Sequence, residues 1–489
     1  MKIDLNINPE LEIARSQTRR HFLERCSLGL AGMFLASQDA AGYAGQGENP
    51  LAPKKPHFDP KARAVIYLHM AGSPSQLDLF DWKPELVKYN DQDCPRHLLE
   101  GKRFAFIKGV PKMLGTPYKF AQSGGSGAWV SELLPHFSKV ADDVTIIRSM
   151  TTEQFNHAPA QLFLHTGNPR FGYASLGAWA TYGLGSENQD LPGFVVLAGG
   201  GNNPDGGKSL WGSGFLPSVY QGVQCRTSGD PVLFLSDPEG MTRRLRRQTL
   251  DAIRDLNQMQ QERFGDPETS ARIAQYELAY RMQISVPEVM DISREPEAMH
   301  KLYGAQPGKV SFANNCLLAR RLVEKGVRFV QLFQWGWDHH GSNRHEDIRY
   351  DLPAKAKNVD QPIAALIQDL KQRGLLDSTL VVWGGEFGRT PMRENRGGAY
   401  GQFVGRDHHP HAFTVWLAGG GVKAGLNYGE TDDIGYYASR DPVTVRDLQA
   451  TILHLLGLDA HKLSYPFQGL NQRLIGPTEE ARVVKALMA

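Results

Sequence analysis

Short, uninterrupted apolar runs constrain the fold of this chain more than any other feature. Six such runs read as strands, and they do not alternate polar and apolar residues as a half-exposed strand would. They cover residues 64–68, 144–147, 194–197, 327–333, 379–383 and 413–417. Helical patterns over 363–370 and 445–456 lie among them. Continuous apolar strands interleaved with helices predict an α/β fold with three αβα layers and a mostly parallel sheet.

One long segment departs from this alternation. Between about Asp237 and Pro296 the chain becomes charged and glutamine-rich, with helical spacing and no strand signal. We therefore expect a main domain over residues 61–480 with a helical insertion at 237–300. Four arginines open the insertion, at positions 243, 244, 246 and 247. They suit either a solvated helix face or a contact to an acidic substrate or partner.

The N-terminus resembles an export signal. Arg19 and Arg20 precede Phe22 and Leu23, an apolar stretch follows at 27–36, and small residues cluster at 40–42. This order predicts a twin-arginine signal peptide over residues 1–45 and a linker over 46–60. The expected partner is the twin-arginine export machinery, and the expected location is periplasmic or extracellular. The apolar stretch is too short to cross a bilayer, so no transmembrane span is expected in the mature protein. An amphipathic N-terminal helix is the alternative.

Composition excludes several classes of function. The formal net charge is +2, so the overall charge does not indicate a nucleic-acid partner. Four cysteines without a C-x-x-C pair argue against a thiolate zinc site. The chain also lacks a G-x-S-x-G elbow and a P-loop motif. The glycine-rich residues 199–207 are interpreted as a flexible surface loop.

Four clusters of polar residues are interpreted as following predicted strands, where α/β sheets form their sites. They are Asn156-His157, Asp338-His339-His340, Glu386 with Arg389 and Thr390, and Asp407-His408-His409 with His411. Imidazoles interleaved with carboxylates are suited to zinc, manganese or a similar divalent ion. Arg389, with Thr390 beside it, would suit the binding of an anionic substrate, because a guanidinium can grip phosphate or sulfate through two hydrogen bonds. The alternative is that these histidines only cap loops or pair with nearby carboxylates.

Several motifs resemble the alkaline-phosphatase and sulfatase superfamily. Residues 366–383 resemble the segment that leads to a metal-binding turn, and residues 447–458 resemble the D-L-x-P-T-L-L-x-L-x-G helix. The twin-arginine leader, G-x-P-S-Q-x-D-x-F-D at 72–81, G-E-F-G-R-T-P at 385–391 and G-R-D-H at 405–408 resemble its exported branch, catalogued as a domain of unknown function. The resemblance covers about Ala62 to Gln472 and implies an alkaline-phosphatase-like fold.

The resemblance also implies roles for individual residues. Asp338 and His340 match an aspartate and a histidine that bind one ion, and His408 matches the histidine that completes it, with Asp407 alongside. Glu386 matches the aspartate of a second ion, whereas Phe387 stands in the place of that ion's histidine. The implied cofactor is a divalent metal, either zinc, manganese or calcium.

The resemblance leaves the nucleophile open. Aligning residues 164–167 with the L-T-G end of the nucleophile helix puts His157 near the position of the sulfatase cysteine. His157 could form a phosphohistidine, act as a general base or bind a metal; attack by water activated by the ion is another route. Arg389 would stabilise the transferred group. The implied function is hydrolysis of phosphate or sulfate esters; the alternative is a non-catalytic sulfatase-like binding or structural protein of the cell envelope.

Overall fold

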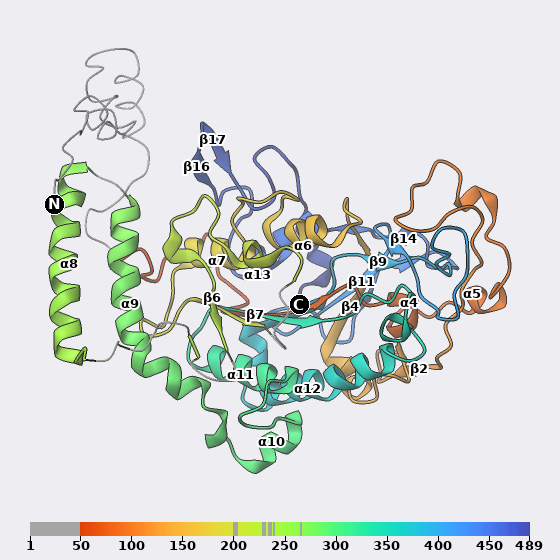
Figure 1. The fold of residues 1–489 in the computed structure, drawn as a ribbon, viewed down its shortest axis with the longest axis horizontal. Coiled ribbons are helices and arrows are strands. Elements are labelled where there is room, and N and C mark those ends of the chain that lie inside the picture. Colours follow the sequence, from red (N-terminus) through yellow and green to blue (C-terminus); the bar gives the residue numbers. More distant parts are fainter. Residues whose placement is uncertain (1–48, 199–203, 227–230, 233–236, 238–239, 265–266) are drawn as a thin grey trace, which may run out of the picture. The chain divides into compact units, whose positions relative to one another are not determined.

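A nine-stranded sheet forms the centre of the fold (Figure 1). The computed structural model describes residues 49–198, 204–226, 231–232, 237, 240–264 and 267–489; the predicted signal peptide lies outside them. The strands run in the order β12-β4-β11-β8-β1-β7-β5-β6, and β15 also pairs with β4. Their bounds are β1 Ala64–Ala71, β4 Val144–Thr151, β5 Phe194–Ala198, β6 Val223–Cys225, β7 Phe329–Trp335, β8 Thr379–Gly384, β11 Phe413–Ala418, β12 Asn427–Tyr428 and β15 Val443–Thr444. All six predicted strands are therefore present.

Helices cover both faces of the sheet. In Figure 1, α11 (Phe312–Glu324) and α12 (Leu352–Gln372) lie below it, and α6 (His157–Thr166), α7 (Leu176–Leu184) and α13 (Val445–Leu455) lie above it. Neighbouring strands pair in parallel except at β11, which is antiparallel to both β4 and β8. The predicted three-layer α/β class with a mostly parallel sheet is confirmed. None of the described helices is both long and apolar enough to cross a bilayer.

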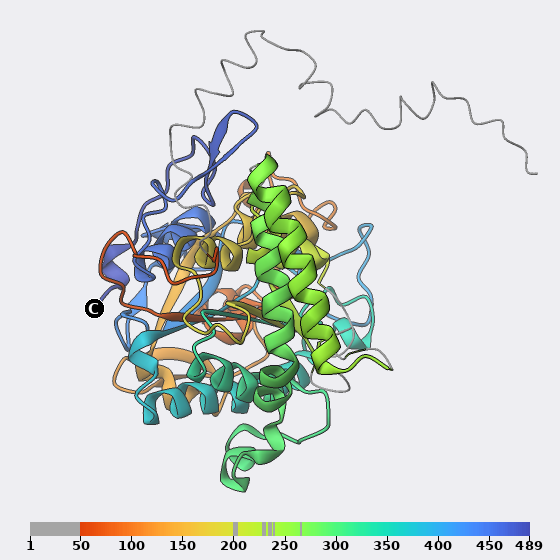
Figure 2. The ribbon, with the colours of Figure 1, turned by 90° about the vertical axis from the view of Figure 1, so that its left-hand side faces the viewer.

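Smaller elements complete the described chain. They are α4 (Gln76–Leu79), α5 (Pro84–Lys88), β2 (Phe120–Ser123), β3 (Ala128–Ser131), α10 (Glu297–Tyr303), β9 (Gly388–Arg389), β10 (His408–His409), β13 (Glu430–Thr431), β14 (Ala438–Arg440), β16 (Tyr465–Phe467) and β17 (Leu470–Gln472). Two long helices, α8 (Arg243–Phe264) and α9 (Pro267–Met290), lie side by side as a pair (Figure 2). Arg247 on α8 pairs with Glu277 on α9 at 2.6 Å, so one of the four opening arginines is used in packing the pair.

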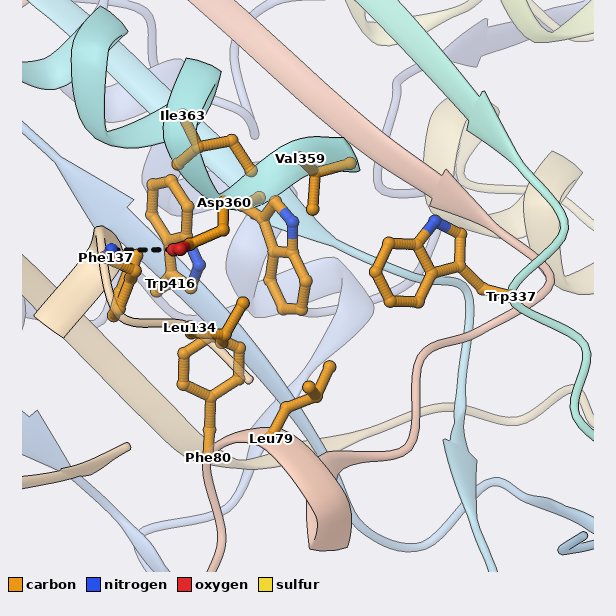
Figure 3. A pocket seen from close by; sticks show the side chains of 10 residues that line it. Leu79, Phe80, Leu134, Phe137, Trp337, Val359, Asp360, Ile363 and Trp416 are labelled. Atoms are coloured by element: carbon orange, nitrogen blue, oxygen red, sulfur yellow. Dashed lines mark hydrogen bonds between the residues drawn. The ribbon is translucent and has the colours of Figure 1, made fainter. Parts of the chain in front are cut away.

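The core between the sheet and α12 is rich in aromatic side chains (Figure 3). Asp360 of α12 is buried among them, and its carboxylate accepts hydrogen bonds from the backbone N–H groups of His136 (2.8 Å) and Phe137 (2.7 Å). Burial raises the pKa of Asp360, against these bonds. The hole lined by Asp360, Phe137 and Trp416 among others holds about 10 Å³, which is no more than one water molecule needs. This region is therefore packing, and a ligand site has to be sought at the edge of the sheet.

The direction of β11 decides what lies at that edge. The cluster at 405–411 was interpreted as following a strand, and this is wrong, because it precedes β11. Since β11 runs against its neighbours, its beginning lies at the same edge as the ends of β7 and β8. The antiparallel strand thus brings His408 to the residues that follow the parallel strands.

Candidate metal centre

Four side chains from distant parts of the chain converge at this edge. His157 opens α6 after β4, Asp338 and His340 follow β7, and His408 begins β10. One ligand atom from each lies within 4.8 Å of the others. The Oδ1 atom of Asp338 is 2.8 Å from Nε2 of His340, 3.2 Å from Nε2 of His157 and 3.5 Å from Nε2 of His408. Three imidazoles therefore surround one carboxylate oxygen.

Each imidazole is held by its other nitrogen. Nδ1 of His157 lies 2.7 Å from Oε1 of Glu386, and Nδ1 of His408 lies 2.7 Å from the carbonyl oxygen of Phe155. Nδ1 of His340 contacts the carboxylate of Glu394. With protons on Nδ1, all three Nε2 atoms point their lone pairs into the cluster. This is the arrangement by which proteins orient histidines toward a metal ion.

The distances between the imidazoles require something positive among them. Nε2 of His340 and Nε2 of His408 are 3.0 Å apart, and the buried Nε2 of His157 faces Oδ1 of Asp338 at 3.2 Å. Two lone pairs at that separation repel unless a proton or a cation lies between them. Three nitrogen donors and one carboxylate are a donor set that fits a divalent cation.

In the metal-free protein, neighbouring charges and burial determine which side chains of the cluster are protonated. Burial would lower the pKa of His157, but the hydrogen bonds to Asp338 and Glu386 outweigh it and raise that pKa to about 9. Burial lowers the pKa of His408 to about 4, so this imidazole is neutral at neutral pH. The pKa of Asp338 stays far below its usual value: burial opposes this, but Arg389 and the histidines prevail. A cation would displace the proton from His157 as it bound.

Glu386 lies behind His157 and does not face the cluster. Its side chain is fully buried, and Oε1 also accepts from the N–H of Gly72 and the amide of Gln161, both at 3.1 Å. Oε2 lies 3.4 Å from Nε2 of His69. Burial opposes ionisation, but the bonds to His157 and His69 hold the pKa of Glu386 well below its usual value. The residue expected to bind a second ion thus contacts His157 of the cluster from behind.

Asp407 is likewise occupied by neighbouring groups. Its Oδ2 accepts from the N–H of Phe106 (2.7 Å) and of Ile107 (3.0 Å), and Oδ1 accepts from the N–H of His408 (2.7 Å). One of its oxygens also lies within 4.8 Å of His340 and Glu394 ligand atoms. Asp407 therefore ties the loop at 106–107 to the strand that carries His408.

The predicted anion-binding residues point away from open space. Arg389 is 1% exposed and donates to Asp338 (2.5 Å), to the carbonyl of Ser73 (3.0 Å), and to the carbonyls of Gly72 and Arg406. Four of its five N–H groups are thereby used. Thr390 is also buried, and its hydroxyl donates to the carbonyl of Met392. The structure thus places Arg389 against Asp338, with little capacity left for a substrate.

A cleft of about 640 Å³ opens beside the cluster, lined in part by His157, Asp338, Asp205, Trp335 and Lys355. Among the described residues, no serine, threonine or cysteine lines it. Asp205 lies in the segment interpreted as a surface loop, of which residues 199–203 fall outside the described chain. Partial burial raises the pKa of Asp205, although the residue remains exposed to solvent.

Two phenylalanines wall the cluster. The Phe387 ring lies 4.9 Å from the His157 ring and 4.5 Å from the His408 ring, and the Phe106 ring lies 4.9 Å from that of His340. An apolar ring thus stands where the resemblance would put a ligand of a second ion. Beside the first cluster, His340, Glu394 and Asp407 form a second group whose ligand atoms lie within 4.8 Å of one another.

Sequence reasoning missed Glu394, Gln161 and Lys355. Glu394 follows Glu386 by eight residues in a loop, without a histidine nearby in sequence to draw attention to it. Lys355 lies on a long helix whose other lysines face solvent, so nothing in its spacing distinguishes it. Only the fold shows which carboxylate meets which imidazole.

The chain is similar to a family of unknown function and to several solved structures. The family described as "Protein of unknown function (DUF1501)" matches residues 62–488, which confirms the resemblance to a branch of unknown function. A search of curated proteins finds no match. Three similar solved structures are a protein in the alkaline phosphatase superfamily from Vibrio parahaemolyticus, a sulfatase from Pseudoalteromonas sp. and a phosphonate monoester hydrolase from Silicibacter pomeroyi. The first is 12% identical to this chain with a TM-score of 0.38, and the match covers 94% of this chain and 78% of that chain. The sulfatase is 11% identical with a TM-score of 0.35, and the match covers 86% of this chain and 73% of that chain. The phosphonate monoester hydrolase is 12% identical with a TM-score of 0.33, and the match covers 87% of this chain and 76% of that chain.

Proposed function

Since this chain belongs to the family described as "Protein of unknown function (DUF1501)", we propose its function from the site itself: metal-dependent hydrolysis of phosphate or sulfate esters. One observation supports this most directly. Three Nε2 atoms converge on Oδ1 of Asp338, and each of these imidazoles is held through Nδ1 by an acceptor. This is the arrangement by which proteins orient histidine nitrogens toward a metal ion.

We propose His157, Asp338, His340 and His408 as the ligands of one ion. Zinc or manganese suits three nitrogens and one oxygen better than calcium, which prefers oxygen donors. When bound, the ion would polarise an ester oxygen and increase the acidity of a water molecule. Arg389 contributes by offsetting the charge of Asp338 and fixing its orientation.

The attacking group in this proposal is water. No hydroxyl or thiol side chain lines the described cleft, and both ring nitrogens of His157 are engaged, by Asp338 and Glu386. This argues against a phosphohistidine. We assign Asp205 as the acceptor of the proton of the water, because it lines the cleft and partial burial raises its pKa. Export to the periplasm or exterior by the twin-arginine route remains a prediction that rests on Arg19 and Arg20.

Elemental analysis of the full-length exported protein, with turnover of 4-nitrophenyl phosphate and 4-nitrophenyl sulfate, tests the proposal. Asp338→Asn and His408→Ala should lose both the ion and turnover. His411→Ala is the matched control, because His411 is exposed and lies outside the cluster. Full metal content and full activity in either cluster variant would remove the assignment.

One observation favours a second candidate, a protein that binds at this site without catalysis. Phe387 occupies a place where related enzymes would have a ligand, and Arg389 has few donors left for a substrate. Retained metal with no turnover over a broad panel of phosphate and sulfate esters would favour this reading.

A further inference from the structure

Lys355 is one of the residues that line the cleft. It lies on α12, is half-buried, and lines the same cleft as His157 and Asp338. A Cβ atom built on Gly336 would lie 2.4 Å from its Nζ atom, so the ammonium group rests directly over the Gly336 backbone, two residues before Asp338. Gly336 has a φ of +95°, and no larger residue would leave this space.

The ammonium group of Lys355 has no partner within the described chain. No ion pair or hydrogen bond engages Nζ, although the carboxylates of Asp205, Glu346 and Asp351 line the same cleft. Glu346 instead accepts from Asn343 at 2.7 Å, and Asp351 lies 3.2 Å from His339. Arg389 shows the contrast, since its donors are almost all used inside the protein. A half-buried lysine kept unpaired beside a candidate metal centre is available to an anion.

We infer that Lys355 binds the anionic group of the substrate, and that the substrate is an ester whose alcohol part carries no negative charge. The inference rests on the proposed function. Lys355 alone among the described cleft residues is a lysine or arginine, and its Nζ atom lies over Gly336, two residues before Asp338. The carboxylates of Asp205, Glu346 and Asp351 line the rest and repel a second anionic group. Neutral and cationic alcohols meet no such repulsion.

Binding of inorganic phosphate and inorganic sulfate to the zinc-loaded full-length protein tests the role of Lys355, with calorimetry as the readout. Lys355→Met should raise the Kd of the better-bound anion roughly 10- to 100-fold, the range for losing a hydrogen bond to a charged group. Zinc content should stay at the wild-type value. Lys357→Met is the matched control, because Lys357 is an exposed neighbour on α12 that does not line the cleft. Lys355→Arg should recover part of the affinity.

Turnover adds a readout of the substrate class. In the wild type, kcat/KM for phenyl phosphate should exceed that for 4-carboxyphenyl phosphate by roughly tenfold or more, as expected for like charges brought together. Equal anion affinities in Lys355→Met and wild type overturn the role of Lys355, and equal kcat/KM values overturn the substrate class. A wild type that holds zinc but binds neither anion also overturns the inference. Absence of zinc from the wild type is a different result, because it refutes the proposed function itself.

Discussion

Glu394 offers a sharp test of the proposed metal centre, because it contacts His340 but is not one of the four residues proposed to bind the ion. Its side chain is 1% exposed, one oxygen contacts Nδ1 of His340, and the other accepts from Nε of Arg396 at 2.8 Å. Glu394→Gln keeps the shape and one acceptor for His340 while removing the charge. The displaced partner is Arg396, which is 50% exposed and can turn to solvent. The change therefore isolates the effect of the carboxylate on His340.

The size of the effect follows from burial. Removing a partner of this kind typically costs 10- to 100-fold in metal affinity, or about 1.4–2.8 kcal/mol. Since the side chains of His340 and Glu394 are 4% and 1% exposed, solvent screens their interaction little. We therefore expect the upper half of that range, about 30- to 100-fold in the Kd for zinc.

The assay is competition for zinc between the protein and a chromophoric chelator at fixed pH. Glu346→Gln serves as the control, because Glu346 lines the cleft but its recorded bond goes to Asn343 and not to a histidine. Denaturant unfolding of the metal-free variants checks that they remain folded. A folded Glu394→Gln protein that binds zinc as tightly as the wild type would refute the idea that Glu394 tunes the centre through His340.

Three further predictions concern stability. In the metal-free protein the pKa of His157 is raised to about 9, so the contribution of protonated His157 to the free energy of unfolding is complete below about pH 6.5 and is lost as pH rises through 9. The free energy of unfolding should therefore fall between about pH 6.5 and 9.5. A rise over this range would contradict the prediction. Gly72→Ala should destabilise by about 1–3 kcal/mol in denaturant unfolding, because φ is +102° and the added Cβ would lie 2.8 Å from the backbone nitrogen of Asp338; a wild-type midpoint would contradict it. Asp78→Asn should cost about 3–5 kcal/mol, since Asp78 and Arg406 form a fully buried pair at 2.8 Å; calorimetry showing under 1 kcal/mol would refute a role for the pair.

Much of this fold could be predicted because burial leaves a direct mark on sequence. A strand covered on both faces must be apolar throughout, and all six such runs are strands. An apolar run does not indicate the direction of its strand, however, so the sequence does not predict that β11 is antiparallel to its neighbours. Asp338, His340 and His408 were predicted together from motifs, and the structure does bring them together.

Arg389 and Glu386 lie differently from the sequence-based expectation because of side-chain direction, which sequence spacing does not record. The turn after β1 presents the carbonyls of Gly72 and Ser73, both at positive φ, toward the guanidinium of Arg389. No pattern in the sequence indicates that two carbonyls will occupy an arginine expected to bind substrate. The same holds for Glu386, because its position in the sequence does not show whether its carboxylate faces the cluster or lies behind His157.

The placement of β11 has a consequence for how the protein matures. This strand enters the sheet between β4 and β8, and the residues just before it supply His408. The other three residues proposed as ligands belong to earlier parts of the chain, the first of them about half the chain away. A nascent or partly folded molecule that has not inserted β11 therefore holds an incomplete set of donors. Tight metal binding would then occur only after β11 has joined the sheet, so metal content would distinguish fully folded molecules from partly folded ones.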